Sequence, residues 1–154
     1  MALNPGDPAP DFSLPATGGE TLSLAGLKGR KAVLYFYPKD DTSGCTLEAQ
    51  AFNGLRQAFA EADTAVIGVS PDPMKSHDKF REKYGLDFPL ASDETKAMLE
   101  AYGVWVEKSM YGRKYMGVER TTFLIDRDGR IAKVWQKVKV PGHADAVLAA
   151  AQAL

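Results

Sequence analysis

The sequence predicts an α/β protein with a mixed central β-sheet flanked by helices. Two continuous apolar runs, residues 32–37 (AVLYFY) and 65–69 (AVIGV), resemble central strands that are covered on both faces. A segment with helical periodicity lies between them, which implies a parallel βαβ unit. Residues 121–126 (TTFLID) and 131–138 flank the turn sequence RDG, so they predict an antiparallel hairpin that extends the sheet.

The N-terminal part of the chain is expected to hold little regular structure. Residues 1–12 carry three prolines and a glycine, which favours an extended, irregular arm. Apolar and polar side chains alternate around residues 22–24, and this alternation indicates a short strand. Residues 26–31 predict a basic turn before the first buried strand.

Helical spacing of apolar residues predicts four helices. The first covers about residues 45–61, and the second covers residues 73–84. The third covers residues 93–102, and the second and third are each stopped by the glycine that follows. The fourth is the alanine-rich stretch 143–154. The apolar positions that define the first helix are Ala49, Phe52, Leu55, Ala58 and Phe59.

Length and composition favour a single globular domain over residues 1–154. Hydrophobic residues make up 45% and charged residues 25% of the 154 positions, with a net charge of −1. The charges are spread along the chain, so we expect no nucleic-acid partner. The N-terminus does not resemble a signal peptide, and no apolar run approaches the ~20 residues of a membrane span. We therefore expect no membrane partner and a cytoplasmic location.

Few residues in the sequence suit a metal ion or a cofactor, and we expect neither. A single cysteine, Cys45, excludes an internal disulfide and a cysteine-based zinc site, and it fits a reducing compartment. His77 and His143 lie far apart in the sequence, without a carboxylate pattern around them. We interpret both histidines as surface residues that serve neither as metal ligands nor as bases.

The surroundings of Cys45 suggest a reactive thiol. Pro38 ends the first buried strand, a polar loop follows, and the predicted helix begins at about Cys45. Unpaired backbone N–H groups and the helix dipole place partial positive charge at a helix N-terminus, which favours the thiolate. Thr42 or Ser43 is expected to cap this helix. We expect the thiol at the base of a small pocket rather than in the core.

The spacing of Pro38, Thr42 and Cys45 matches the pattern PxxxTxxC, and Glu48 continues it. This segment resembles the active site of peroxiredoxins of the Q type, which are also called bacterioferritin comigratory proteins. Further blocks resemble that family in the same order along nearly the whole chain. They are residues 7–14, 68–72, 88–93, 111–117 and 120–126. The resemblance implies a thioredoxin-like fold with an N-terminal extension.

The resemblance also implies a role for each site residue. Cys45 matches the peroxidatic cysteine, whose thiolate attacks a peroxide oxygen and becomes sulfenic acid. Thr42 matches the threonine whose hydroxyl contacts the sulfur and the peroxide, and Pro38 matches the proline that shields the thiolate from water. Arg120 matches the arginine that reaches this pocket. Glu48 matches the acid that orients an arginine.

Acidification of a thiol cannot by itself give an efficient peroxidase. Lowering a thiol pKa from 8.5 to about 6 raises the thiolate fraction at pH 7 roughly 30-fold. The accompanying fall in nucleophilicity is about 13-fold, which leaves a net gain of only about 2- to 3-fold. Charge that develops on the breaking O–O bond must therefore meet fixed donors. Arg120, Thr42 and the first N–H groups of the helix are the candidates.

The sequence departs from the family pattern at two positions. Gln50 stands where many members carry a resolving cysteine, and Ser43 replaces the usual proline. Gln50 is open to two explanations, a natural residue or an engineered replacement. Without a second thiol, the sulfenic acid of Cys45 must react with an external one. That reductant could be a small thiol, a thioredoxin- or glutaredoxin-like protein, or Cys45 of a second molecule. The resemblance suggests a monomer or a weak homodimer.

These observations predict a thiol-dependent peroxidase that acts on hydrogen peroxide and organic hydroperoxides in antioxidant defence. A redox sensor that oxidises at Cys45 and passes a disulfide to a partner is a second hypothesis, motivated by the missing resolving thiol. A thioredoxin-fold binding protein is a third. The aromatic and apolar stretch 102–116 either packs onto the domain or forms a rim that selects organic peroxides or docks a reductant.

Overall fold

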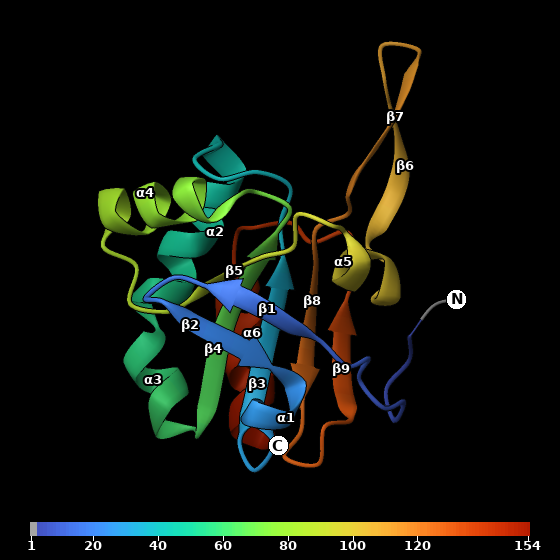
Figure 1. Ribbon diagram of the computed structural model, residues 1–154. Helices are drawn as coiled ribbons and strands as arrows, with labels where there is room; N and C mark the ends of the chain where they lie inside the picture. The colour runs from blue at the N-terminus through green and yellow to red at the C-terminus, as the bar shows by residue number, and fades with distance from the viewer. Residues whose placement is uncertain (1–2) are drawn as a thin grey trace.

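A computed structural model describes residues 3–154 (Figure 1). The elements run in chain order as β1 (Ser13–Ala16), β2 (Glu20–Ser23), α1 (Leu24–Leu27), β3 (Lys31–Phe36), α2 (Ser43–Gly54), α3 (Arg56–Glu61), β4 (Thr64–Ser70), α4 (Met74–Tyr84), β5 (Leu90–Ser92), α5 (Ala97–Ala101), β6 (Trp105–Met110), β7 (Arg113–Val118), β8 (Thr121–Ile125), β9 (Ile131–Trp135) and α6 (His143–Ala153).

Seven strands form one mixed sheet in the order β2-β1-β5-β4-β3-β8-β9. Strand β3 is central and entirely buried, and it pairs parallel with β4 and antiparallel with β8. The β3–β4 pair confirms the predicted βαβ unit, and the antiparallel β8–β9 pair confirms the predicted hairpin. The mixed α/β architecture is therefore the one that the sequence predicts.

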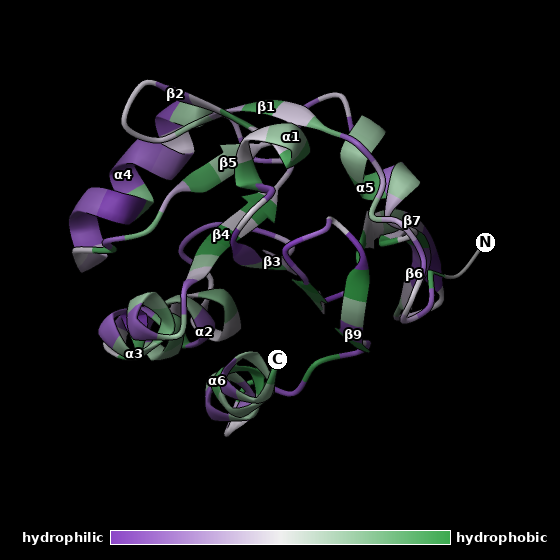
Figure 2. Cartoon of the chain, turned by 90° about the horizontal axis from the view of Figure 1, so that it is seen from below, coloured by the Kyte–Doolittle hydropathy of each residue, from purple (hydrophilic) through white to green (hydrophobic). Residues whose placement is uncertain are grey.

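Helices cover both faces of this sheet. Successive side chains along β3 point to opposite faces, and apolar residues are buried on each of them. Val33, Tyr35 and Tyr37 face an apolar cluster shared with α2, α3, α4 and α6. Leu34 and Phe36 face a second cluster that includes residues of α1 and α5. Figure 2 shows α2, α3 and α6 on one side of the sheet and α1 and α5 on the other.

Two predicted helices differ from those observed. The helix expected over residues 45–61 starts earlier, at Ser43, and is divided at Leu55 into α2 and α3. The helix expected over residues 93–102 is shortened to α5, because Lys96 adopts a left-handed conformation with φ of 65°. By contrast, α4 ends at the predicted Gly85, which takes the left-handed conformation that glycine allows.

Four strands, β1, β5, β6 and β7, lie in regions where the sequence patterns gave no strand, and one predicted strand has slightly different bounds. The strand expected at residues 22–24 is β2, which ends one residue earlier and pairs with β1. Strands β6 and β7 form a separate two-stranded hairpin. This hairpin extends away from the body of the molecule (Figure 1).

Within the described residues, no helix is long and apolar enough to cross a bilayer.

The interpretation of both histidines as surface residues was wrong. His77 on α4 is fully buried, and His143 at the start of α6 is also buried. Each has polar partners that a sequence pattern does not reveal. His77 contacts Asp40 and the backbone of Ala91, and His143 Nε2 lies 2.8 Å from Thr122 Oγ1.

Candidate active site

Cys45 lies in the first turn of α2, beyond the carboxyl end of the central strand β3. Ligands of α/β sheets commonly bind at the carboxyl ends of strands. The side chain is more deeply placed than expected, because the residue is only 2% exposed and belongs to an apolar cluster with Tyr37 and Phe52. The expectation of an accessible thiol outside the core was therefore wrong.

The sulfur nevertheless has a charged polar partner. Arg120 lies just before β8, and its Nη2 group donates a hydrogen bond to Cys45 Sγ at 3.2 Å. The antiparallel pairing of β8 with β3 brings these two residues together across the sheet. A guanidinium at this distance stabilises a thiolate. It also stabilises negative charge that moves from the sulfur to a neighbouring atom during a reaction.

Glu48 holds the same guanidinium from the other side. Its Oε1 atom accepts a hydrogen bond from Arg120 Nη1 at 2.6 Å. Glu48 stands one helical turn after Cys45 on α2, so both side chains face Arg120. The structure thus brings Cys45, Arg120 and Glu48 into one chain of contacts.

Gly44 makes room for this arrangement, although no sequence pattern singled it out. A Cβ atom at this position would lie 3.3 Å from Arg120 Nη2, so a larger side chain would press on the guanidinium. The only signal in the sequence is a glycine directly before the cysteine.

Thr42 and Pro38 lie on the loop that leads from β3 to Cys45. Thr42 has the extended backbone of an N-cap residue, but its side chain does not cap the helix. Its hydroxyl instead donates to the carbonyl oxygen of Lys39 at 2.9 Å. Among the described residues, no hydrogen bond joins Thr42 to Cys45. Pro38 is half-buried at the start of the loop.

Comparison with known proteins identifies the family. The sequence model of the AhpC/TSA family matches residues 5–134. A putative peroxiredoxin Bcp from Coxiella burnetii is 52% identical over 143 residues, which cover 93% of this chain and 95% of the relative. Peroxiredoxin Bcp from Bacillus subtilis is 50% identical over 93% of this chain and 91% of the relative. The chain belongs to the peroxiredoxins. It is therefore a thiol peroxidase of the AhpC/TSA family.

Solved structures place this peroxiredoxin in the Q, or Bcp, type. Peroxiredoxin Q from Xanthomonas campestris superimposes with a TM-score of 0.89 and 48% identity, over 92% of this chain and 90% of the other. A cysteine-to-serine mutant of Xylella fastidiosa PrxQ gives a TM-score of 0.94 at 41% identity, over 99% and 98%. These matches confirm the thioredoxin-like peroxiredoxin fold.

Burial gives the Glu48 carboxyl of this peroxiredoxin an unusual electrostatic state. Burial raises its pKa from 4.5 to about 7, and the positive charge of Arg120 only partly opposes that shift. The residue is 1% exposed, and its Oε2 atom has no hydrogen-bond partner among the described residues. A neutral carboxyl tolerates such a site better than a carboxylate does.

A second cation, Lys108 on β6, is electrostatically coupled to this site. Burial and the neighbouring charge of Arg120 lower the pKa of its amine, and Glu119 and Cys45 oppose that shift. Lys108 was not among the residues expected at the site, because the hairpin that carries it was not predicted. Its positive charge is coupled to those of Arg120 and Cys45.

Glu48 and His143 predict opposite effects of pH on stability. Glu48 has a pKa of about 7 in the folded state and 4.5 as its ordinary value, so its contribution to stability is lost as pH rises from 4.5 through 7. At about 1.4 kcal/mol for each pH unit, the loss amounts to roughly 3 kcal/mol. Burial lowers the pKa of His143 from 6.5 to about 4, so its contribution is lost as pH falls through that interval.

Urea unfolding between pH 4.5 and 7 checks this prediction. We expect the unfolding free energy of wild type minus that of Glu48→Gln to fall steadily with rising pH. We expect the difference between wild type and His143→Asn to rise over most of the same interval. The exposed Glu82→Gln is a matched control for the substitution itself. A wild-type-minus-Glu48→Gln difference that does not vary with pH would contradict the assignment to Glu48.

The aromatic stretch 102–116 divides into a packed part and an exposed part. Tyr102 and Val104 are buried in the core, as the packing alternative predicts. Met110, Tyr111, Tyr115 and Met116 are exposed on the β6–β7 hairpin, and Tyr111 is 99% exposed. A rim that selects organic peroxides or docks a reductant stays a prediction for this exposed part.

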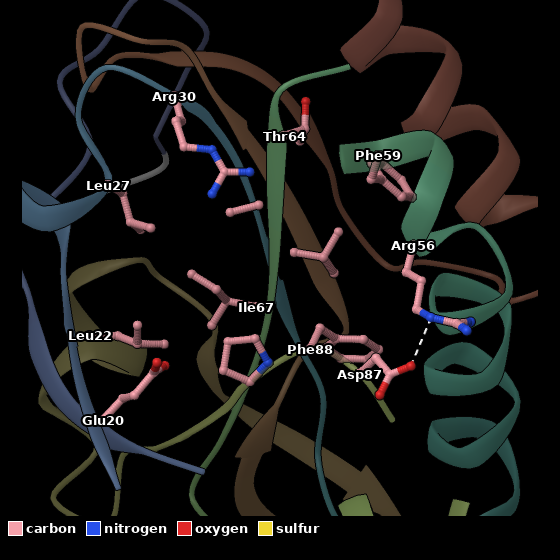
Figure 3. Close-up of a pocket in the computed structure, with 13 residues that line it drawn as sticks. Glu20, Leu22, Leu27, Arg30, Arg56, Phe59, Thr64, Ile67, Asp87 and Phe88 are labelled. Atoms are coloured by element: carbon pink, nitrogen blue, oxygen red, sulfur yellow. Dashed lines mark ion pairs between the residues drawn. The ribbon is translucent and has the colours of Figure 1, made fainter. Parts of the chain in front are cut away.

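An apolar hollow of about 310 Å³ lies elsewhere on the molecule. Leu22, Leu27, Ile67 and Phe88 line it, and the ion pair between Arg56 and Asp87 stands at its edge (Figure 3). Several of its lining residues come from the amino-terminal half of β4, whereas Cys45 follows the carboxyl end of β3. Its lining includes none of the predicted site residues.

Proposed function

We propose that this peroxiredoxin reduces hydrogen peroxide and organic hydroperoxides through Cys45. The observation that carries the proposal is the 3.2 Å contact between Arg120 Nη2 and Cys45 Sγ, with Glu48 behind the guanidinium. The Cys45 thiolate attacks one peroxide oxygen, an S–O bond forms and the O–O bond breaks. Cys45 becomes sulfenic acid, and the leaving oxygen takes a proton to become water or an alcohol.

Each remaining site residue has a role in this step. Arg120 stabilises the charge that moves from sulfur to the leaving oxygen, and Glu48 holds the guanidinium in place. The Thr42 hydroxyl donates its hydrogen bond to the Lys39 carbonyl, so its oxygen lone pairs stay free to accept a hydrogen bond from the peroxide. Pro38 shields the sulfur from bulk water.

We include organic hydroperoxides among the proposed substrates because of a structural neighbour. The bacterioferritin comigratory protein of Xanthomonas campestris has alkyl peroxide reduction activity, and its structure has been solved as a trapped intermediate and ligand complex. That structure matches with a TM-score of 0.88 and 47% identity, over 92% of this chain and 90% of the other. By analogy, we extend the substrate class of this chain to alkyl hydroperoxides.

An external thiol completes the cycle, because the sequence contains one cysteine. The thiol attacks the sulfenic acid, releases water and leaves a mixed disulfide, which a second thiol then reduces. Thioredoxin, a glutaredoxin or a small thiol would supply these electrons. We further infer a single domain in the cytoplasm that is a monomer or a weak homodimer.

Mass spectrometry after one equivalent of peroxide tests the function directly. We expect one added oxygen atom on Cys45, and loss of that oxygen when a thiol is supplied. Cys45→Ser should gain no oxygen at this position. Fast oxidation with slow recycling by every thiol tried would favour the redox-sensor hypothesis, which the single cysteine also motivates. A wild-type Cys45 that stays unmodified would contradict both hypotheses.

A further inference from the structure

The active-site loop carries a buried carboxylate that peroxide chemistry does not explain. Asp40 lies between Pro38 and Thr42, and its side chain is only 3% exposed. Tyr37 Oη donates to its Oδ1 atom at 2.6 Å, and Ser76 Oγ donates to its Oδ2 atom at 2.8 Å. His77 Nδ1 lies 2.7 Å from the same Oδ2 atom. The carboxylate thus ties the loop to α4.

The hydrogen bonds of His77 fix where its protons lie. Its Nε2 atom is 3.0 Å from the carbonyl oxygen of Ala91, which can only accept, so Nε2 carries a proton. The short contact between Nδ1 and Asp40 needs a second proton between the two atoms. Two hydroxyl groups also donate to Asp40, so three side chains hold its carboxyl group. His77 therefore bridges the loop to β5 through the contacts of its two ring nitrogens.

A single peptide unit connects this cluster to the site. The backbone N–H of Asp40 donates to Asp72 Oδ2 at 2.8 Å, and Ser70 Oγ holds the same oxygen at 2.6 Å. The carbonyl at the other end of this peptide belongs to Lys39, and it accepts the hydroxyl proton of Thr42. Because a peptide unit is planar, fixing its N–H also fixes the direction of its carbonyl.

We propose that Asp40, Asp72 and His77 are positioning residues for peroxide reduction, because they fix the Lys39–Asp40 peptide and, through it, the hydroxyl of Thr42. The inference rests on the proposed function, in which Thr42 accepts a hydrogen bond from the peroxide. Within the part of the chain that the structure describes, no hydrogen bond or ion pair joins these three residues to the Cys45 sulfur or the Arg120 guanidinium. It acts on the reaction only by holding the loop that presents Thr42.

A metal ion is a weaker explanation of the same cluster. Asp40, Asp72 and His77 each offer a ligand atom within 4.8 Å of one another. Hydrogen bonds already engage these groups, however, with His77 Nδ1 bound to Asp40 and Asp72 Oδ2 bound to Ser70 and a backbone N–H. The hydrogen bonds therefore account for this cluster without a metal ion.

Asp72→Ala tests the proposal at the peptide itself. Asp72 is half-buried in a loop, so the substitution should leave the fold intact. We expect the second-order rate constant for peroxide oxidation of Cys45 to fall by about 10- to 100-fold, as small misplacements of reacting groups do. Alkylation of Cys45 by iodoacetamide does not use the Thr42 hydroxyl, so its rate should not fall.

Variants of His77 separate positioning from simple loss of structure. His77→Leu should reduce the peroxide rate as Asp72→Ala does, and His77→Asn should restore part of it, because its amide N–H can replace Nδ1–H. If His77→Leu does not fold, Ser76→Ala takes its place. This variant removes one hydrogen-bond donor to Asp40 at a smaller cost in stability. The matched control is Tyr84→Phe, which cuts the exposed bond to Asp41 on the same loop and helix. It should leave the rate within about 2-fold of wild type.

A double-mutant cycle with Thr42→Val decides the pathway. If the cluster acts through Thr42, adding Asp72→Ala to Thr42→Val should lower the peroxide rate little further. Fully additive losses would overturn the proposal, as would a wild-type peroxide rate in both Asp72→Ala and His77→Leu. A fall in alkylation equal to the fall in peroxide oxidation would also overturn it. Failure of the wild type to react with peroxide would instead reject the proposed function.

Discussion

Replacing Cys45 with serine is expected to abolish peroxide consumption with dithiothreitol as the reductant. Serine keeps the size and burial of the side chain, but its hydroxyl does not ionise near neutral pH and cannot cycle through sulfenic acid. The chain contains no other cysteine that could substitute for it. The measurement is the loss of peroxide over time, with hydrogen peroxide and an alkyl hydroperoxide tested separately.

Serine at this position should also preserve the fold, which makes the comparison clean. Circular dichroism and the thermal midpoint of unfolding serve as controls for the variant. Equal rates of peroxide loss for wild type and Cys45→Ser would end the assignment of Cys45 as the reactive thiol.

Arg120→Met is expected to lower kcat/KM for peroxide by about 10²- to 10³-fold, the usual cost of losing a donor to developing charge. The substitution removes the N–H groups that contact Cys45 Sγ and Glu48 Oε1. Arg120→Lys should recover only part of the loss, because a single ammonium group cannot make both contacts of a planar guanidinium. Steady-state kinetics with a saturating thiol provide the measurement.

The matched control is Arg113→Met on β7, where the arginine is exposed on the hairpin. It removes the same positive charge without touching Cys45 or Glu48. A loss of similar size in Arg113→Met would assign the effect to the overall charge of this face. Wild-type kinetics in Arg120→Met would remove Arg120 from the mechanism.

The sequence predicted the fold correctly wherever one strong local pattern determined the structure. The apolar runs of β3 and its neighbour β4 predicted the centre of the sheet, and the turn sequence at residues 127–129 predicted the β8–β9 hairpin. The strands and the turn depend on apolar runs and on turn residues, which are visible in a sequence. The expectation that Glu48 on α2 and Arg120 just before β8 lie near Cys45 came from the resemblance to the Q-type peroxiredoxins, and the structure has both residues in contact with this site.

Features that depend on tertiary contacts were missed or misread. His77 carries no local sign of burial, because its partners Asp40 and Ala91 come from other parts of the chain. Cys45 was expected to be accessible because it lies at the start of a helix. That position does not show how closely Tyr37 and Phe52 pack around the side chain. The break at Leu55 and the left-handed Lys96 likewise leave no trace in the spacing of apolar residues.

The depth of the Cys45 sulfur also has a kinetic consequence for regeneration of the enzyme. A peroxide is small enough to approach a side chain that is 2% exposed, but thiol exchange needs the incoming sulfur aligned with the bond that it breaks. A bulky protein reductant therefore requires the first turn of α2 to open before it can react. Turnover should then reach a plateau as reductant concentration rises, at the rate of that opening, while the oxidation half-reaction continues to scale with peroxide.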